Sequence, residues 1–237
     1  MLIRVTEKCR MGCSHCMINA GPNGRHMARD IYKQTLEFIR ETGFPLMMIS
    51  GGEPMEHPDI LILLQMAVDA GLKTTLLSNG MFLTDQELTK KVLDLDVLVQ
   101  ITNDSRFYPE KVPHIKHEKV IYEDSIRLVS PFGRALENKI PVTRQSPLCF
   151  NFRSIVRHFH DFLQGLYQLR LRMKMCTPSI NIDGSISAGE SNSCHCIGTV
   201  YDSNLELTNK VCNMRCDKCG LVNNLDELHK GAIGEVP

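Results

Sequence analysis

The sequence predicts an α/β fold with parallel strands and a small, cysteine-rich C-terminal subdomain. Over the first hundred residues, strand-like and helix-like segments alternate in units of about 30 residues. Units of this kind give parallel strands joined by right-handed crossovers. From Cys176 onward the composition changes, and six of the ten cysteines lie among Gly, Asn, Ser and Asp residues. For the first part, either an open doubly wound sheet or a full or partial barrel satisfies the pattern.

Short apolar runs bounded by polar or glycine residues indicate the strands. We expect strands at residues 2–6, 46–50, 73–78 and 97–102, with a weaker fifth strand at 118–122. A first helix is expected over residues 28–42, closed by Gly43. A second begins at Pro58 and ends at Gly71. Thr84 and Glu87 have the spacing of a capping box for a third helix.

The following segment gives two further periodicities. Apolar residues from Phe152 to Leu166 follow helical spacing. Residues 169–175 (LRLRMKM) alternate strictly between apolar and basic side chains, which predicts a strand. Cys149 has no nearby cysteine and is interpreted as a small apolar core residue.

The composition excludes several classes of protein. The 237 residues contain 27 basic and 27 acidic side chains, so no net field attracts nucleic acid or an anionic membrane. The longest apolar run, Ile60 to Val68, is far shorter than the roughly 20 residues that span a bilayer. The start, MLIRVTEKC, lacks the apolar centre of a secretory signal. A cytoplasmic location is therefore expected, where clustered cysteines are more often metal ligands or catalytic thiols than disulfides.

Three cysteines follow the first predicted strand at close spacing: Cys9, Cys13 and Cys16. A cubane [4Fe–4S] cluster bound by three thiolates keeps one iron free for a small molecule, as a catalytic zinc keeps one open position. A zinc site or a set of buried thiols is the alternative. Polar loops also follow the other strands: Ser50-Gly51-Gly52-Glu53-Pro54, Ser78-Asn79-Gly80 and Thr102-Asn103-Asp104. Because carboxyl ends of parallel strands share one edge, we expect all four loops to meet.

The CxxxCxxC segment at Cys9–Cys16, followed by GGEP after the second strand, resembles the radical S-adenosylmethionine superfamily. The resemblance implies a partial (β/α)6-type barrel over residues 1–175. It also implies that the open iron chelates the amino and carboxylate groups of S-adenosylmethionine. Further cofactor contacts are expected from the GGEP loop, the third and fourth strand ends and the residue before the third cysteine: Gly51, Gly52, Glu53, Pro54, Ser78, Asn79, Thr102 and His15.

The resemblance further implies the reaction class. The reduced cluster donates one electron to the sulfonium, and homolysis yields methionine and a 5′-deoxyadenosyl radical. That radical takes a hydrogen atom from a substrate carbon. The cofactors supply the reactivity, while the protein supplies binding, alignment and exclusion of water.

The C-terminal cysteines resemble the auxiliary-cluster region called SPASM, or its shorter form twitch. Cys176, Gly189 and Cys194 have a Cys-x12-Gly-x4-Cys arrangement, and Cys216 and Cys219 form a CxxC. The resemblance implies that residues 176–237 form a cluster-binding subdomain with Cys176, Cys194, Cys216 and Cys219 as ligands of an auxiliary [4Fe–4S] cluster. Cys196 and Cys212 are left over; either could replace a ligand, or both could help to hold a second auxiliary cluster. A zinc ribbon is the alternative.

Two substrate classes stay open. A peptide or protein, oxidised or cross-linked, is slightly favoured because that is the commoner use of this architecture; a small metabolite, oxidised or rearranged, is the alternative. We expect a reductant such as flavodoxin or ferredoxin as partner, and neither a membrane nor a nucleic acid. A non-catalytic iron–sulfur or zinc sensor is a hypothesis of another class, although such a sensor needs no S-adenosylmethionine pocket.

Overall fold

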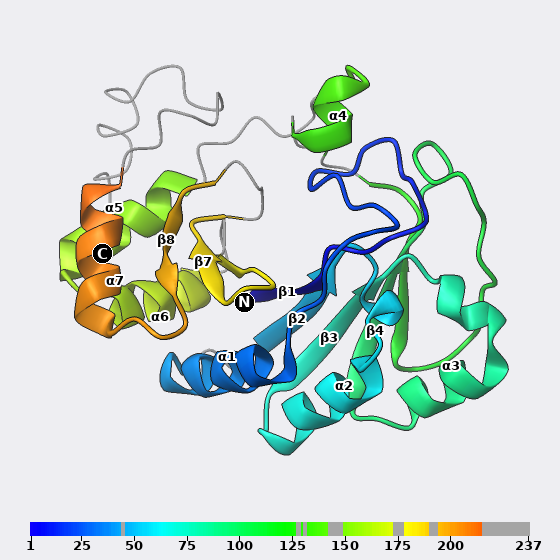
Figure 1. The fold of residues 1–237 in the computed structure, drawn as a ribbon, viewed down its shortest axis with the longest axis horizontal. Helices are drawn as coiled ribbons and strands as arrows, with labels where there is room; N and C mark the ends of the chain where they lie inside the picture. Colours follow the sequence, from blue (N-terminus) through cyan, green and yellow to red (C-terminus); the bar gives the residue numbers. More distant parts are fainter. Residues whose placement is uncertain are drawn as a thin grey trace.

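The computed structural model describes residues 1–43, 46–126, 129, 132–141, 149–172, 178–189 and 194–214. Within them lies an eight-stranded sheet with the order β5-β4-β3-β2-β1-β6-β7-β8 (Figure 1). The strands are β1 (Leu2–Thr6), β2 (Leu46–Gly51), β3 (Lys73–Ser78), β4 (Val97–Thr102), β5 (Val120–Glu123), β6 (Ser179–Ile180), β7 (Ser185–Ser187) and β8 (Cys196–Thr199). The helices are α1 (Arg29–Glu41), η1 (Pro54–Glu56), α2 (Ile60–Asp69), η2 (Met81–Thr84), α3 (Gln86–Leu93), α4 (Gly133–Glu137), α5 (Cys149–Phe159), α6 (Phe162–Arg172) and α7 (Asn204–Asn213).

The strands β1 to β5 are parallel and are wound in chain order. This confirms the predicted α/β fold: β1, β3 and β4 have the expected bounds, β2 is one residue longer, and β5 is displaced by a residue or two. The carboxyl ends of these strands therefore share one edge of the sheet. The loop that carries Cys9, Cys13 and Cys16 lies at this edge (Figure 1).

The sixth strand extends the sheet on the other side of β1. Continued winding would place it beside β5, but β6 pairs in parallel with β1, with Leu2 opposite Ser179. The strands β7 and β8 follow in antiparallel order. The strands β6 to β8, which all follow Cys176, thus continue the same sheet as the N-terminal strands, and the division of the chain at residue 176 stays a prediction.

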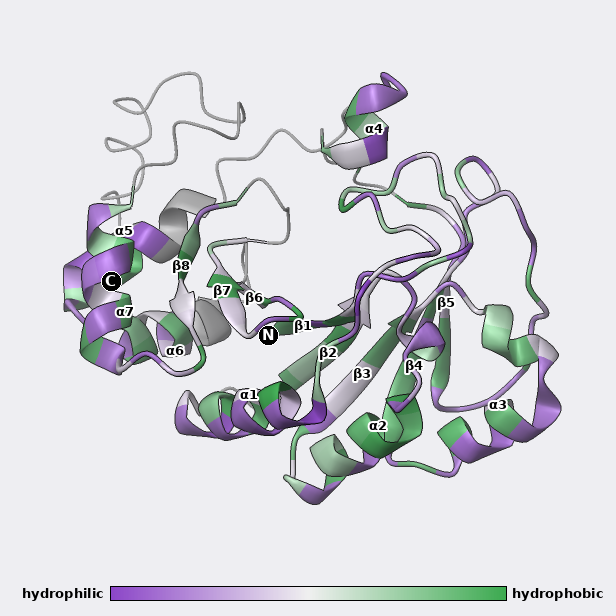
Figure 2. Cartoon of the chain, in the orientation of Figure 1, coloured by the Kyte–Doolittle hydropathy of each residue, from purple (hydrophilic) through white to green (hydrophobic). Residues whose placement is uncertain are grey.

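Helices α1, α2 and α3 lie along one face of the sheet (Figure 1). Their apolar sides, which include Phe38 and Leu63, pack on alternate strand residues such as Ile3 and Ile49. Figure 2 shows hydrophobic residues concentrated in the central strands and in α2. The same core reaches the C-terminal helices, since the rings of Phe38 and Phe162 of α6 lie 6.3 Å apart. In the part of the chain that the structure describes, no helix has both the length and the apolarity to cross a bilayer.

Two local predictions are wrong, and a third is confirmed with a break. The strand expected over 169–175 is helical over residues 169–172, because α6 continues there and Leu, Gln and Arg all favour a helix; residues 173–175 lie outside the described part of the chain. The helical spacing predicted from Phe152 to Leu166 is confirmed, and it is divided between two helices by a break at His160, whose φ is 50°. Asp85, not Thr84, caps α3, because its side chain accepts from the backbone N–H of Leu88.

Candidate functional site

A cavity of about 550 Å³ lies at the carboxyl ends of the parallel strands. It brings together the three N-terminal cysteines and most of the predicted loop residues: Cys9, Cys13, His15, Cys16, Ser50, Gly51, Gly52, Ser78, Asn79 and Thr102. Other lining residues come from the inner face of the sheet and from later loops: Leu2, Arg4, Leu77, Gln100, Tyr108, Glu123, Ile126, Val129 and Arg134. The strand ends therefore converge on one hollow, as the parallel topology requires.

The cysteine loop leaves β1 and returns to it. Cys9 N donates to Gly21 O at 2.9 Å, and Cys16 N donates to Cys13 O at 3.3 Å. Gly12 turns the chain with a φ of 68°, which a side chain would strain. Cys9 and Cys13 are both 8% exposed. Burial raises the pKa of the Cys9 thiol and raises that of Cys13 to about 12, so the metal-free site favours neutral thiols.

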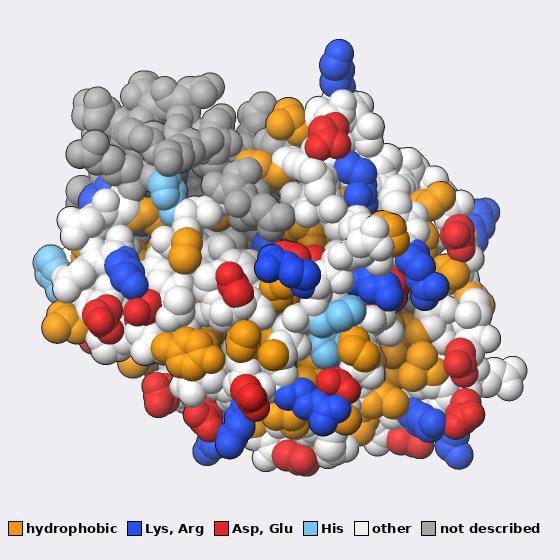
Figure 3. All heavy atoms as spheres, in the orientation of Figure 1, with side chains coloured by type: hydrophobic (Ala, Val, Ile, Leu, Met, Phe, Trp, Pro, Cys, Tyr) orange, Lys and Arg blue, Asp and Glu red, His pale blue; other side chains and the backbone are white. Residues whose placement is uncertain are grey.

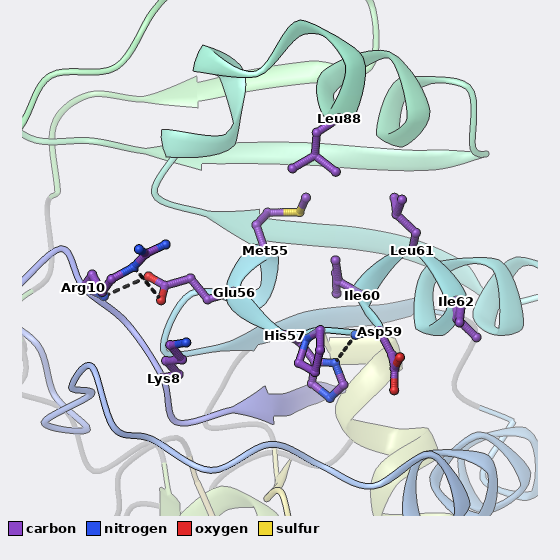
Figure 4. A pocket seen from close by; sticks show the side chains of 11 residues that line it. Lys8, Arg10, Met55, Glu56, His57, Asp59, Ile60, Leu61, Ile62 and Leu88 are labelled. Carbon is purple, nitrogen blue, oxygen red and sulfur yellow. Dashed lines mark hydrogen bonds and ion pairs between the residues drawn. The ribbon is translucent and has the colours of Figure 1, made fainter.

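A carboxylate holds the cysteine loop from outside the sheet. Glu56 of η1 accepts from the Arg10 backbone N–H at 2.8 Å and from Arg10 Nε at 3.1 Å (Figure 4). This contact borders a second hollow, also of about 550 Å³, between the cysteine loop, η1 and α2. None of the three N-terminal cysteines lines that hollow. Basic and acidic side chains are interspersed over the face of the molecule seen in Figure 3.

The two glycines of the GGEP segment allow the loop after β2 to lie directly on the end of β1. Gly52 N donates to Thr6 O at 2.7 Å. A Cβ atom on Gly52 would lie 2.2 Å from Lys8 O, and one on Gly51 would lie 2.2 Å from Thr6 O. Gly51 also has a φ of 141°. Within the described chain, these glycines are required by the close approach of two backbone segments, and both face the cavity.

Glu53 joins the loops after β2 and β3. Its buried carboxylate accepts hydrogen bonds from Ser78 Oγ at 2.8 Å, Asn79 N at 2.7 Å and Met55 N at 3.0 Å. Burial raises the pKa of Glu53 to about 7, although these three donors oppose the shift. Neither Glu53 nor Pro54, which opens η1, lines the cavity. Their predicted contacts with a cofactor stay predictions; the structure shows Glu53 as the link between two loops.

The loop after β3 approaches the cysteines. Asn79 Nδ2 lies 4.0 Å from Cys9 Sγ, and Asn79 Oδ1 accepts from Met81 N at 2.9 Å. Ser78 Oγ, besides donating to Glu53, accepts from Gly80 N at 3.0 Å. Thr102, at the end of β4, also lines the cavity. The hydroxyl of Ser78 therefore already has partners, whereas Asn79 directs its amide group toward a thiol.

His15 lies against an aromatic pair that sequence reasoning missed. Its ring centroid is 4.7 Å from that of Phe107 and 5.4 Å from that of Tyr108. The Nδ1 atom of His15 is buried and finds no hydrogen-bond partner in the described part of the chain. Burial also lowers the pKa of His15, so the ring is neutral near neutral pH. A buried nitrogen without a partner beside a cavity is available to a bound group.

Asp104 holds the loop that carries this aromatic pair. Its carboxylate accepts from Arg106 Nε at 2.9 Å and from Ile126 N at 2.7 Å. These hydrogen bonds hold the pKa of Asp104 well below its usual range. Backbone bonds from Phe107 N to Asp104 O and from Ser14 N to Phe107 O then fix the loop against the cysteines. In the sequence, the signal for this loop was an Asp two residues after a predicted strand, because Asp commonly forms turns.

The predicted C-terminal ligands are only partly covered by the described residues. Cys176, Cys216 and Cys219 lie outside them. Cys194 lies two residues before β8, and Cys212 belongs to α7. Cys196 begins β8, and its Sγ donates to Gly198 O at 3.4 Å. Cys149 begins α5. Among the described residues no three His, Cys, Asp or Glu side chains are close enough to hold a single metal ion.

The N-terminal site fits a [4Fe–4S] cluster. Such a cluster binds each thiolate to a separate iron, so the thiols need only face one hollow, as those of Cys9, Cys13 and Cys16 do. Residues 3–122, half of the chain, match the family model described as "Radical SAM superfamily". The chain belongs to the radical SAM superfamily. The family implies a [4Fe–4S] cluster and binding of S-adenosylmethionine.

Relatives of this radical SAM chain match a little over a third of its length. An AdoMet-dependent heme synthase of Methanosarcina barkeri is 32% identical over 89 residues, which are 36% of this chain and 25% of that protein. A PqqA peptide cyclase of Bradyrhizobium diazoefficiens is 29% identical over 92 residues, 38% of this chain and 24% of that protein. The match thus covers about a quarter of the length of each of these two relatives.

Solved structures share the fold over nearly the whole radical SAM chain. BtrN in complex with AdoMet and 2-DOIA superimposes with a TM-score of 0.60 at 15% identity, covering 94% of this chain and 92% of that one. Native anSMEcpe with bound AdoMet and Cp18Cys peptide gives a TM-score of 0.51 at 13% identity, covering 92% and 85%. These likenesses show the fold alone.

Proposed function

We propose that this chain binds a [4Fe–4S] cluster through Cys9, Cys13 and Cys16, and S-adenosylmethionine at the iron that has no protein ligand. The observation that carries the proposal is the convergence of the three thiols and the Gly51-Gly52 backbone on one cavity. When bound and reduced, the cluster supplies the single electron that cleaves S-adenosylmethionine to methionine and a 5′-deoxyadenosyl radical. Membership of the radical SAM superfamily supports this assignment.

The residues around the cavity would bind and orient the nucleotide. The backbone of Gly51 and Gly52 can come close to a ligand because neither residue carries a Cβ atom. Thr102 offers a hydrogen bond at the cavity wall, as does the Nδ1 of His15, which has no partner among the described residues. Glu53 does not line the cavity, but its carboxylate fixes the loop that carries Asn79.

The proposed reaction is removal of a hydrogen atom from a peptide or protein substrate, which leaves oxidised or cross-linked. Support comes from relatives whose names state such substrates, among them the PqqA peptide cyclases, and from the fold shared with peptide-bound anSMEcpe. A small metabolite is the second candidate. It is favoured by the likeness to BtrN, which spans 92% of that chain and was solved with 2-DOIA.

An auxiliary cluster is proposed for the C-terminal cysteines. Its ligands would be Cys176, Cys194, Cys216 and Cys219, with Cys196 and Cys212 as replacements or as ligands of a second auxiliary cluster. Such a cluster would accept an electron from the substrate radical or bind the substrate. The proposal rests on the cysteine spacing and on the position of Cys194 two residues before β8. A flavodoxin or ferredoxin would reduce the N-terminal cluster.

Anaerobic reconstitution tests the central proposal. The protein is loaded with iron and sulfide and reduced with dithionite in the presence of S-adenosylmethionine, and 5′-deoxyadenosine is measured by chromatography. We expect release of 5′-deoxyadenosine even without substrate. A Cys9/Cys13/Cys16 triple alanine variant should lose about four irons per chain and all 5′-deoxyadenosine formation.

A Cys194/Cys196/Cys212 triple alanine variant is the matched control, because it removes the same number of thiols outside the cavity. It should keep the four irons of the N-terminal site. Unchanged iron in the Cys9/Cys13/Cys16 variant, or zinc in place of iron in the wild type, would reject the proposal.

A further inference from the structure

A short segment far along the chain covers the cysteine loop. Helix α4 lies above the carboxyl edge of the sheet, beside the cysteine loop (Figure 1). Asn138 Nδ2, at the end of this helix, donates to Ser14 O at 2.8 Å, and Asn19 Nδ2 donates to Glu137 Oε1 at 3.0 Å. The cysteine loop is thus bound by residues more than a hundred positions later, which no local pattern in the sequence indicated.

Arg134 makes the central contacts of this segment. Its Nε donates to Cys13 O at 2.8 Å and its Nη1 donates to Ala20 O at 2.8 Å. Its backbone N–H donates to Cys16 O at 2.9 Å. One residue therefore binds the carbonyl groups of two of the three cysteines and of the end of the loop.

The approach of the two segments is unusually close. A Cβ atom on Gly133 would lie 2.5 Å from Cys16 O, and the φ of Gly133 is 53°, which also favours glycine. Because any larger residue would push the segment away, Gly133 allows the Arg134 backbone to reach the loop. The planar guanidinium then binds two carbonyls with fixed geometry, which the single ammonium group of a lysine cannot reproduce.

We propose that Arg134 is a positioning residue of the cluster-binding loop, and that its positive charge raises the reduction potential of the cluster held there. The inference rests on the proposed function, because it requires a cluster bound by Cys9, Cys13 and Cys16. Two effects follow from one side chain. The hydrogen bonds fix the directions of the cysteines, and the charge stabilises the reduced, more negative cluster.

The electrostatic environment is consistent with this effect. Arg134 lines the same cavity as the three thiols. A fixed cation beside a buried site acts more strongly than one in water, because the surroundings screen it less.

Three variants separate the two effects. Arg134→Gln removes both the charge and the paired hydrogen bonds, Arg134→Lys keeps the charge, and Lys139→Gln removes an exposed charge from the same segment as a control. Each loaded protein is measured for iron content, for the rate of iron release to a chelator, and for the midpoint potential by dye-mediated titration followed by electron paramagnetic resonance. Circular dichroism verifies folding.

For Arg134→Gln we expect the equilibrium constant for cluster reduction to fall about tenfold, which corresponds to a potential lower by about 59 mV for one electron. Iron release should be about tenfold faster than in the wild type. Arg134→Lys should release iron as quickly as Arg134→Gln. Its equilibrium constant for cluster reduction should stay within about threefold of the wild-type value. Lys139→Gln should match the wild type in both measurements.

The outcomes distinguish this inference from the proposed function. A wild type that binds no iron at Cys9, Cys13 and Cys16 rejects the proposed function. A wild type with its four irons, together with an Arg134→Gln variant of unchanged potential and unchanged iron release, rejects the role of Arg134. Should Arg134→Gln fail to fold, Arg134→Lys decides, and iron release at the wild-type rate in that variant overturns the inference.

Discussion

The hydroxyl of Ser78, the last residue of β3, donates a hydrogen bond of 2.8 Å to Oε1 of Glu53, which follows β2. The second carboxylate oxygen, Oε2, accepts from the backbone of Asn79 at 2.7 Å. The side chain of Asn79 in turn lies 4.0 Å from Cys9 Sγ. A buried acid thus connects the GGEP segment, the third strand end and the cysteine loop. The geometry of the cavity depends on this carboxylate even though Glu53 does not line it.

Replacing Glu53 by Gln should destabilise the protein. An amide has one oxygen where the carboxylate has two, so the N–H of Asn79 or the hydroxyl of Ser78 loses its acceptor in a buried place. We expect the free energy of unfolding to fall by about 2 kcal/mol, measured by urea titration. Glu87→Gln, which alters an exposed ion pair with Lys91, should change it by less than about 0.5 kcal/mol. Equal effects of the two substitutions would contradict the structural role of Glu53.

The same carboxylate should make stability depend on pH. The pKa of Glu53 is raised from 4.5 to about 7 in the folded protein. Between these values the folded state binds more protons at this site than the unfolded state, so the contribution of Glu53 to stability falls as the pH rises through this window. Its size is about 3 kcal/mol. Urea titrations across the window should show a shallower decline in Glu53→Gln than in the wild type; parallel curves would refute the shift.

A methyl group at Gly52 should disrupt the site. The Cβ atom of Gly52→Ala would lie 2.2 Å from Lys8 O, so the loop after β2 must move away from the end of β1. We expect a loss of more than about 2 kcal/mol in the free energy of unfolding and reduced iron after reconstitution. Gly21→Ala is the matched control, because nothing lies within 4 Å of its Cβ position. A Gly52→Ala protein with wild-type stability and iron would show that the two loops are not held this closely.

Asp104→Asn should loosen the loop beside His15. The carboxylate accepts hydrogen bonds from Arg106 and from Ile126 N, which hold its pKa below the usual range. Its contribution to folding stability is therefore present at neutral pH. That contribution is lost as the pH falls toward and below the usual range. We expect about 2 kcal/mol lower stability at neutral pH, with the difference shrinking in acid. Denaturant titrations at neutral and acidic pH measure it. A constant difference between variant and wild type at both pH values would contradict the ionic role.

Much of the fold could be predicted because its signals are local. Apolar runs that end in polar loops gave the positions of β1 to β4 to within a residue, since a buried parallel strand and its turn are encoded by neighbouring residues. Residues 169–172 show where such signals fail: alternation over a few positions also fits a helix that packs on its neighbours. The position of β6 beside β1 had no local signal, because strand pairing depends on which edge of the sheet is free.

By itself, the sequence determined that Cys9, Cys13, Cys16 and the GGEP segment follow strand ends, and parallel winding brings such ends to one edge. Only the tertiary structure decided how that edge is held together. Arg134 binds the cysteine loop from 121 positions away, and the Phe107 carbonyl binds Ser14 N from the loop after β4. Such contacts join segments that the chain alone keeps far apart, so their hydrogen-bonding partners become defined only once the sheet and its loops have assembled.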